Sequence, residues 1–181
     1  MWLNICTEAR DNIENLGHIL GGIKTNIYPH KKNVMWWIMT KDKKDITKVK
    51  EAIASSNEST PPVTFETIGF PVIIMVGDKN VFLDTCNHGY VHFCHEFDYP
   101  HPFLVNNIRD YMYGPSLKLK CVIPGSGEAV NDKEYLGQYL LSRYDIDSVR
   151  FGNENDFITR LEKTVNILSK PEGRTFYRKQ N

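Results

Sequence analysis

The chain has 181 residues, of which 41% are hydrophobic and 24% are charged, a composition typical of one packed domain rather than of a disordered protein. Its 22 basic and 22 acidic residues give a formal net charge of zero. No stretch approaches the roughly 18 uninterrupted apolar residues of a membrane span, and the first residues lack a secretion signal. We therefore expect a cytoplasmic protein with no membrane partner.

The first part of the chain predicts alternating strands and helices. Residues 2–6 alternate like a short strand, and residues 13–20 place apolar side chains at helical spacing until two glycines end the pattern. The run Val34–Met39 predicts a strand covered on both faces. Asp45 begins a predicted helix, which ends in a polar loop at residues 55–62.

The middle of the chain predicts strands in quick succession. Residues 71–76, 80–86 and 90–97 are rich in strand-forming side chains, with a further strand expected at residues 63–68. The turns between them contain glycine and asparagine, which tolerate the backbone conformations of tight hairpins. We therefore expect β-hairpins at the centre of the fold.

The remainder predicts helices alternating with strands. Helical spacing at residues 104–112 is followed by an alternating strand at 117–123 and by a helix with Asn131 as its cap. A short strand at 147–151 precedes a last helix that Asn153 opens.

The element order predicts an α/β protein with a single mixed sheet flanked by helices, central β-hairpins and two lobes. Residues 1–98 form the first expected lobe, and residues 99–170 form the second, packed on the same sheet. The two are joined near residues 99–116, and residues 171–181 form a basic tail.

The segment Thr67–Ile74 reads T-I-G-F-P-V-I-I and is followed by a Gly-Asp turn and a second strand-like run. Together with the preceding β-α-β-α order, it resembles the cis-proline segment of the thioredoxin and glutaredoxin fold. That family's redox chemistry needs a pair of thiols at the start of the first helix. Here that position, Cys6–Ala9, holds one cysteine, so the resemblance implies the fold without disulfide exchange.

From residue 71 onward, the order also resembles a ribonuclease H-like domain, whose members need several converging carboxylates to hold two metal ions. The nearest candidates are Asp78, Asp84, Glu128 and Asp147. The segment 124–127 reads P-G-S-G where an acidic residue would be needed, so the order fits better than the chemistry.

A constellation of polar side chains lies in the expected central hairpin. A three-residue turn at 87–89 places Asp84 opposite His92, with Cys94 two residues along the same face. Ordinary structural pairing is one interpretation. A nucleophilic set is another, in which Asp84 orients His92 and His92 activates Cys94. A zinc site is a third, because thiol and imidazole ligands suit tetrahedral zinc. Its ligands would be Cys86, His88, His92 and Cys94.

The charges are segregated along the chain. Residues 24–50 hold eight lysines against two aspartates, whereas residues 51–110 are predominantly acidic. The ordinary interpretation is that the basic and acidic segments attract each other or lie on separate solvated faces. The more specific hypothesis is that the basic segment and the basic tail contact phosphates. The candidate nucleic-acid-binding residues are Lys31, Lys32, Lys43, Lys44, Arg174, Arg178 and Lys179.

Two hypotheses for function follow from these features. The first is a non-redox binding or modulatory protein that contacts nucleic acid or a protein partner and needs no cofactor. The alternative is a small hydrolase or nuclease that uses Asp84 and His92 with Cys94 or a bound metal, for which zinc is the candidate.

Overall fold

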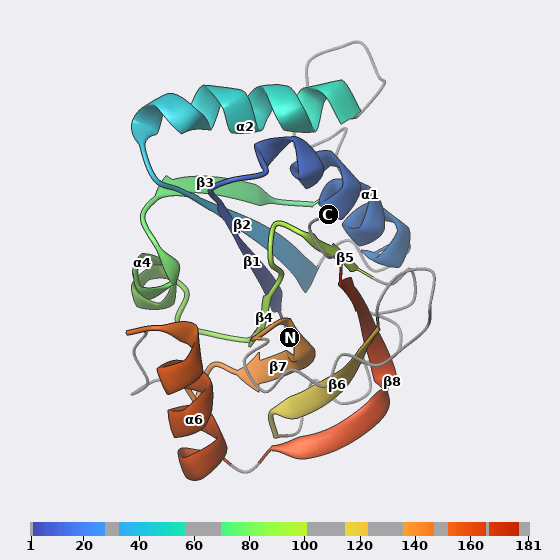
Figure 1. The fold of residues 1–181 in the computed structure, drawn as a ribbon, viewed down its shortest axis with the longest axis vertical. Helices are drawn as coiled ribbons and strands as arrows, with labels where there is room; N and C mark the ends of the chain where they lie inside the picture. Colours follow the sequence, from blue (N-terminus) through green and yellow to red (C-terminus); the bar gives the residue numbers. More distant parts are fainter. Residues whose placement is uncertain are drawn as a thin grey trace.

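The computed structural model describes residues 2–27, 33–56, 70–100, 115–122, 136–146, 152–165 and 167–177. Within these residues the protein is an α/β fold with a single mixed sheet flanked by helices, which confirms the predicted fold class (Figure 1). Eight strands lie in the order β3-β2-β1-β4-β7-β6-β8-β5. The predicted division into two lobes joined near residues 99–116 stays a prediction.

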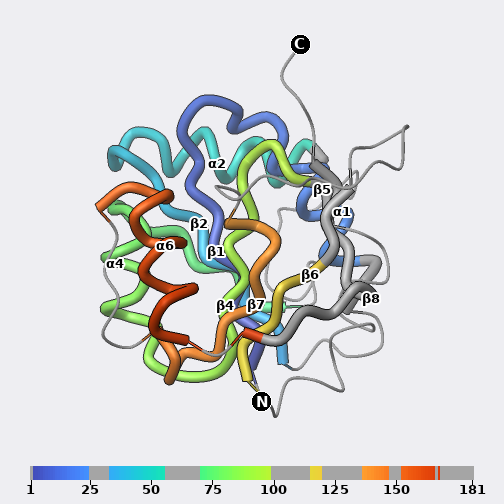
Figure 2. The backbone as a smooth tube through the Cα atoms, turned by 60° about the horizontal axis from the view of Figure 1, so that its bottom comes forward, coloured from blue at the N-terminus to red at the C-terminus, as the bar shows by residue number. Residues whose placement is uncertain are grey.

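The strands are β1 (Leu3–Ala9), β2 (Val34–Thr40), β3 (Val72–Val76), β4 (Tyr90–Phe93), β5 (Asp98–Pro100), β6 (Leu117–Val122), β7 (Tyr139–Ser142) and β8 (Leu168–Tyr177). The helices are α1 (Leu16–Ile27), α2 (Lys43–Ser56), α4 (Lys79–Thr85) and α6 (Glu154–Thr164), with short 3-10 helices η1 (Ile13–Asn15) and η4 (Leu136–Gln138). Strands β1 to β4 are parallel to one another, and β7 pairs antiparallel with both β4 and β6. Figure 2 follows β4, β7 and β6 side by side across the sheet.

Strand β1 lies between two parallel neighbours, with Ile5 opposite Trp36 of β2 on one side and opposite His92 of β4 on the other. Its side chains alternate between two hydrophobic clusters. Leu3 and Ile5 join the cluster that contains α1 and α2, whereas Cys6 joins the cluster that contains α4 and α6. Because both faces are covered, the strand is buried almost throughout, as expected for a parallel sheet.

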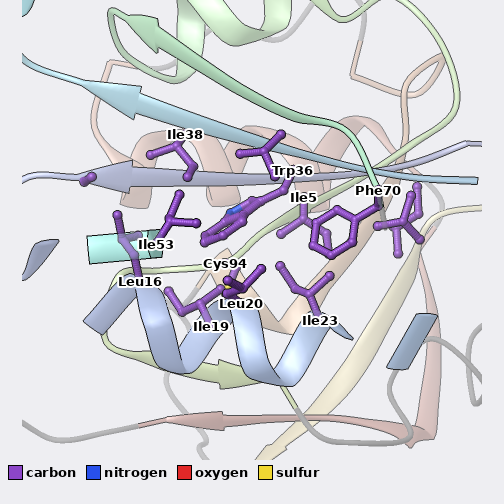
Figure 3. Packing of buried hydrophobic residues seen from close by; sticks show 14 of the residues in the cluster. Ile5, Leu16, Ile19, Leu20, Ile23, Trp36, Ile38, Ile53, Phe70 and Cys94 are labelled. Carbon is purple, nitrogen blue, oxygen red and sulfur yellow. The ribbon is translucent and has the colours of Figure 1, made fainter. Parts of the chain in front are cut away.

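Helices α1 and α2 cover one face of the sheet (Figure 1). Figure 3 shows Ile19 of α1 and Ile53 of α2 around the buried indole of Trp36. The ring nitrogen of Trp36 donates to the hydroxyl of Thr7, at 3.0 Å, so burial leaves its one polar atom bonded.

Helices α4 and α6 cover the other face. The ring of Phe93 meets Phe82 of α4 and Phe157 of α6 edge-on, with ring centroids 5.9 and 6.3 Å apart. Arg143, which follows β7, donates to the carbonyl oxygens of Leu83 and Cys86 at the carboxyl end of α4. A cation placed at this end of a helix bonds its last carbonyls and opposes the helix dipole. These contacts fix α4 on the sheet.

The predicted central hairpin was wrong, because the segment expected as a strand at residues 80–86 is helix α4. Asp78 caps the helix by accepting from the backbone N–H groups of Asn80 and Val81. Phe82, Leu83 and Cys86 are buried whereas Asp84 and Thr85 between them are exposed, which is the spacing of one face of a helix rather than the alternation of a strand. Helix α4 therefore crosses over between the parallel strands β3 and β4.

Other predicted elements were partly right. Helix α1 continues through Gly21–Gly22, where the sequence suggested its end, because Ile23 in the next turn is buried. Asn153 caps α6 as predicted, accepting from the backbone N–H of Asp156 at 2.8 Å. Residues up to 177 of the expected basic tail form strand β8, which pairs with β6 and β5.

Several predicted features lie outside the described residues. They are the strands at 63–68 and 147–151, the helix at 104–112, and the P-G-S-G segment at 124–127. The start of the helix predicted from Asn131 also lies outside them, but the described residues that follow form η4 and strand β7 rather than that helix. In the ranges that the structure does describe, no helix combines the length and apolar character needed to cross a membrane.

Gly89, before β4, provides a test of the packing between β1 and β4. Its φ is +83°, and a side-chain Cβ there would clash with the carbonyl oxygen of Trp2. We expect Gly89→Ala to lower the free energy of unfolding by about 1–3 kcal/mol. Gly21→Ala is the matched control, because it lies in α1 with open space around it and should raise stability by up to about 1 kcal/mol. Urea denaturation of both variants measures this, and wild-type stability of Gly89→Ala would contradict it.

Candidate functional site

A hollow of about 130 Å³ opens at the carboxyl ends of β1 and β4. From β1 the chain passes through helix α1, on one face of the sheet, to the neighbouring strand β2. The other neighbour of β1, strand β4, is reached through helix α4 on the opposite face. In open α/β sheets, ligands bind outside the carboxyl ends of the strands at such a point of reversal. The hollow is lined by Cys6, Glu8, Arg10, Asp11, Lys79, Phe93, Cys94, His95, Glu96, Leu136, Gly137 and Glu154.

Glu96 fastens the loop after β1 to the end of β4. One of its carboxylate oxygens accepts from three successive backbone N–H groups, those of Arg10, Asp11 and Asn12, at 3.0, 3.0 and 2.9 Å. Its backbone carbonyl accepts from the side chain of Asn15 at 2.6 Å. The side chain is 3% exposed, and a carboxylate buried to this degree is stable only when such donors replace water. The Glu96 side chain therefore anchors the backbone of residues 10–12 at the hollow.

Lys79, the first residue of α4, connects three elements across the hollow. Its ammonium nitrogen lies 2.9 Å from a carboxylate oxygen of Glu8, on β1, and 2.9 Å from one of Glu154, on α6. Burial by itself lowers the pKa of Lys79, but the charges of Glu154 and Glu8 more than offset this and raise it above its ordinary value. The side chain is consequently a permanent cation at neutral pH.

Arg10 adds a second cation on the same side of the hollow. Its guanidinium lies 3.6 Å from Glu8 and donates to the carbonyl oxygen of Gly77, after β3, at 3.0 Å. Glu8 also accepts from the backbone N–H of Lys79 at 3.0 Å. The carboxyl ends of β1 and β3 and the start of α4 are thus held together by one carboxylate and two cations.

The cysteine thiols at this end of the sheet are buried. Cys6, Cys86 and Cys94 are free thiols, and Cys6 and Cys94 line the hollow. Burial raises the pKa of the Cys94 thiol, and the nearby carboxylate of Asp98 raises it further. Burial also raises the pKa of Cys6 and of Cys86. A thiol is nucleophilic as the thiolate, so these environments oppose nucleophilic chemistry.

The structure does not bring the predicted Asp84, His92 and Cys94 set together. Asp84 lies on the exposed side of α4. His92 is buried in β4, where its ring nitrogen bonds to the carbonyl oxygen of Gly137 at 2.8 Å, and burial lowers its pKa. Of the three, Cys94 alone lines the hollow. The predicted pairing failed because it depended on a hairpin that is a helix.

The predicted zinc ligands do not converge either. His88 is exposed and contacts the side chain of Asn87, whereas Cys86, His92 and Cys94 are buried. Among the described residues, no three histidine, cysteine or acidic side chains are grouped so that they could hold a metal ion.

The predicted nucleic-acid-binding residues fall largely outside the described part of the chain. Lys43 and Lys44 are exposed in the first turn of α2. Arg174 lies on β8, where only the backbone is described, and Lys31, Lys32, Arg178 and Lys179 lie outside the described residues.

Sequence reasoning missed the residues that build the hollow, which are Glu8, Arg10, Lys79, Glu96 and Glu154. The available signal was a change from apolar to charged residues where two buried strands end, at Glu8–Asp11 and at His95–Glu96. The carboxyl ends of parallel strands meet at one edge of a sheet. Because residues 80–86 and 90–97 were interpreted as a hairpin, β4 was not recognised as a strand parallel to β1, and the meeting of their carboxyl ends was missed.

No protein-family model and no curated protein matches the sequence. Solved structures share its fold. The whole chain superposes on S. aureus TarS 1-349 in complex with UDP-GlcNAc with a TM-score of 0.73 and 10% identity, and covers 59% of that chain. Mannosyltransferase PcManGT from Pyrobaculum calidifontis, in complex with GDP-Man and Mn²⁺, matches 96% of this chain over 56% of its own, with a TM-score of 0.68 and 11% identity.

Glucosyl-3-phosphoglycerate synthase from Mycobacterium tuberculosis, in complex with Mg²⁺ and UDP, matches 99% of this chain over 72% of its own, with a TM-score of 0.60 and 12% identity. The chain spans between 37% and 61% of the TarS chains. At these identities the likeness establishes the fold, which is of the GT-A glycosyltransferase type.

The comparisons correct three predictions. The thioredoxin-like resemblance was wrong, because the matching structures are GT-A glycosyltransferase-like folds. The predicted non-redox binding protein for nucleic acid or a protein partner was wrong for the same reason, since the structures that share the fold include a mannosyltransferase and complexes with nucleotide sugars. The alternative hydrolase or nuclease finds no support among them either.

Replacing Glu96 tests its anchoring role. Glu96→Gln puts an amide group, which is partly a donor, where three backbone N–H groups need an acceptor. We expect the free energy of unfolding to fall by about 1–3 kcal/mol, measured by urea denaturation. Glu51→Gln, at an exposed position of α2, should change it by less than about 0.5 kcal/mol. Equal effects of the two substitutions would contradict the anchor.

The buried thiols predict slow alkylation of the folded protein. At about pH 8, iodoacetamide should leave Cys6, Cys86 and Cys94 unmodified in the native state and modify all three in urea, because burial suppresses the thiolate. Mass spectrometry of the individual peptides measures this. Rapid native labelling of Cys94 would return it to consideration as a nucleophile.

Proposed function

We propose that the chain is the nucleotide-sugar-binding part of a glycosyltransferase, an enzyme that transfers a sugar from a nucleoside diphosphate to an acceptor. The observation that carries the proposal is the hollow at the carboxyl ends of β1 and β4, in a fold shared over the whole chain with a UDP-GlcNAc complex.

The size of the hollow and the two cations in its lining support this proposal. A volume of about 130 Å³ is small against the roughly 300–1,000 Å³ of sites that enclose a whole organic ligand. It suits the diphosphate, with the base and the sugar lying outside it. Arg10 and Lys79 offer the donors that phosphate oxygens need.

Two of the structures with this fold hold Mn²⁺ or Mg²⁺, so a divalent ion is a candidate ligand of the hollow. Such ions need several oxygen ligands that converge on one point. In this hollow, Glu96 accepts from three backbone N–H groups and Glu8 bonds to Lys79, and no three histidine, cysteine or acidic side chains of the described residues converge on one point. The described residues, as arranged, do not fit a divalent ion.

Calorimetric titration with a panel of nucleoside diphosphates tests the proposed function. At least one of UDP, GDP, ADP, CDP and dTDP should bind with a dissociation constant of about 1 µM to 1 mM, a range typical of enzyme substrates. Arg10→Met should weaken that binding at least about tenfold by removing a charge-assisted bond. Lys48→Met, at an exposed position of α2, should leave it unchanged. Absence of binding throughout, or equal binding by Arg10→Met and the wild type, would contradict the proposal.

A further inference from the structure

The ammonium of Lys79 stands between two carboxylates from distant parts of the chain. Glu8 and Glu154 each lie 2.9 Å from the same nitrogen, and the Lys79 side chain is 14% exposed. Two carboxylates facing each other across a gap of this size repel each other unless a cation lies between them. In this protein that cation is the side chain of Lys79.

The two carboxylates are held to different degrees. Glu8 accepts from both the backbone N–H and the ammonium of Lys79, and it lies within 3.6 Å of Arg10. Glu154 contacts Lys79 from the first turn of α6, and its side chain is 37% exposed. Because the carboxylate of Glu154 is partly exposed, water can replace Lys79 around it more easily than around Glu8. Glu154 is therefore the partner of Lys79 that can be displaced.

Displacement of Glu154 would change the charge balance in favour of an anion. The hollow is lined by the carboxylates of Glu8, Asp11, Glu96 and Glu154 as well as by the cations Arg10 and Lys79, so a phosphate can reach Lys79 only where a carboxylate gives way. Glu96 keeps its charge, but three backbone N–H groups hold one of its oxygens in place, so Glu154 is the carboxylate that can leave.

We propose that Lys79, rather than a divalent metal ion, supplies the charge that holds the diphosphate of the nucleotide, and that the diphosphate takes the place of Glu154 at the Lys79 ammonium. This inference rests on the proposed function and adds to it how the diphosphate is bound. It gives Lys79 a binding role and Glu154 the role of a competing anion.

The first arm of the test removes metal ions. The nucleoside diphosphate that binds best in the panel is titrated into wild-type protein treated with EDTA, and again in millimolar MnCl₂ or MgCl₂. We expect dissociation constants equal within about twofold. Binding that needs Mn²⁺ or Mg²⁺, or that tightens tenfold or more with either, would overturn the inference and leave the proposed function standing.

The second arm changes Glu154. In EDTA, Glu154→Gln should bind the nucleoside diphosphate severalfold more tightly, because the competing charge is removed, whereas a carboxylate that held a metal would have the opposite effect. Asp156→Asn is the matched control, since it removes a charge from the same helical turn without contacting Lys79. It should bind like the wild type. Unchanged or weaker binding by Glu154→Gln would overturn the displacement of Glu154.

The third arm changes Lys79 itself. Lys79→Met should lose most of the binding, and Lys79→Arg, which keeps the positive charge, should retain a measurable part of it. Thermal unfolding of each variant identifies any loss that reflects misfolding, and the Glu154 arm does not depend on the Lys79 variants. If no nucleoside diphosphate binds the wild type with or without metal, the proposed function fails and this inference fails with it.

Discussion

The fold depends on the complete enclosure of β1. This strand is hydrogen-bonded to parallel neighbours along both edges and is covered by helices on both faces, so its side chains up to Thr7 have little access to solvent. Buried polar groups are costly unless they are bonded, and Asn4 meets this condition by bonding to Trp37 and to the carbonyl oxygen of His88. Charged residues follow only beyond the part of β1 that pairs with β4, at Glu8 and Arg10.

The charged groups at that edge connect parts of the chain that are far apart in sequence. Lys79 joins β1 to α6, and Glu96 joins the end of β4 to the loop after β1. Arg143 plays the corresponding role at the other end of α4 by bonding its last carbonyls. Each contact places a charged group against partners that replace water, so the hollow has a defined shape before any ligand enters. Pre-organisation of this kind lowers the entropic cost of binding an anion.

How well the sequence predicted an element depended on whether the decisive contacts were local. Strand β2 was found because an unbroken apolar run is what a doubly covered strand requires, and the start of α6 was found because Asn153 bonds within its own first turn. Helix α4 was missed because seven residues are too few to separate a period of 2 from one of 3.6. That single error produced the hairpin and, with it, the pairing of Asp84 with His92.

The sequence by itself determined the class of the fold, since alternating apolar runs and capped helices can pack only as a covered, mixed sheet. It also determined where charge can first appear after each buried strand. The spatial order of the strands was decided by the tertiary structure, because a β-α-β-α start is common to thioredoxin-like and glycosyltransferase-like folds. The meeting of Glu8, Lys79 and Glu154 was decided there too, because electrostatic attraction acts through space between residues that no local pattern relates.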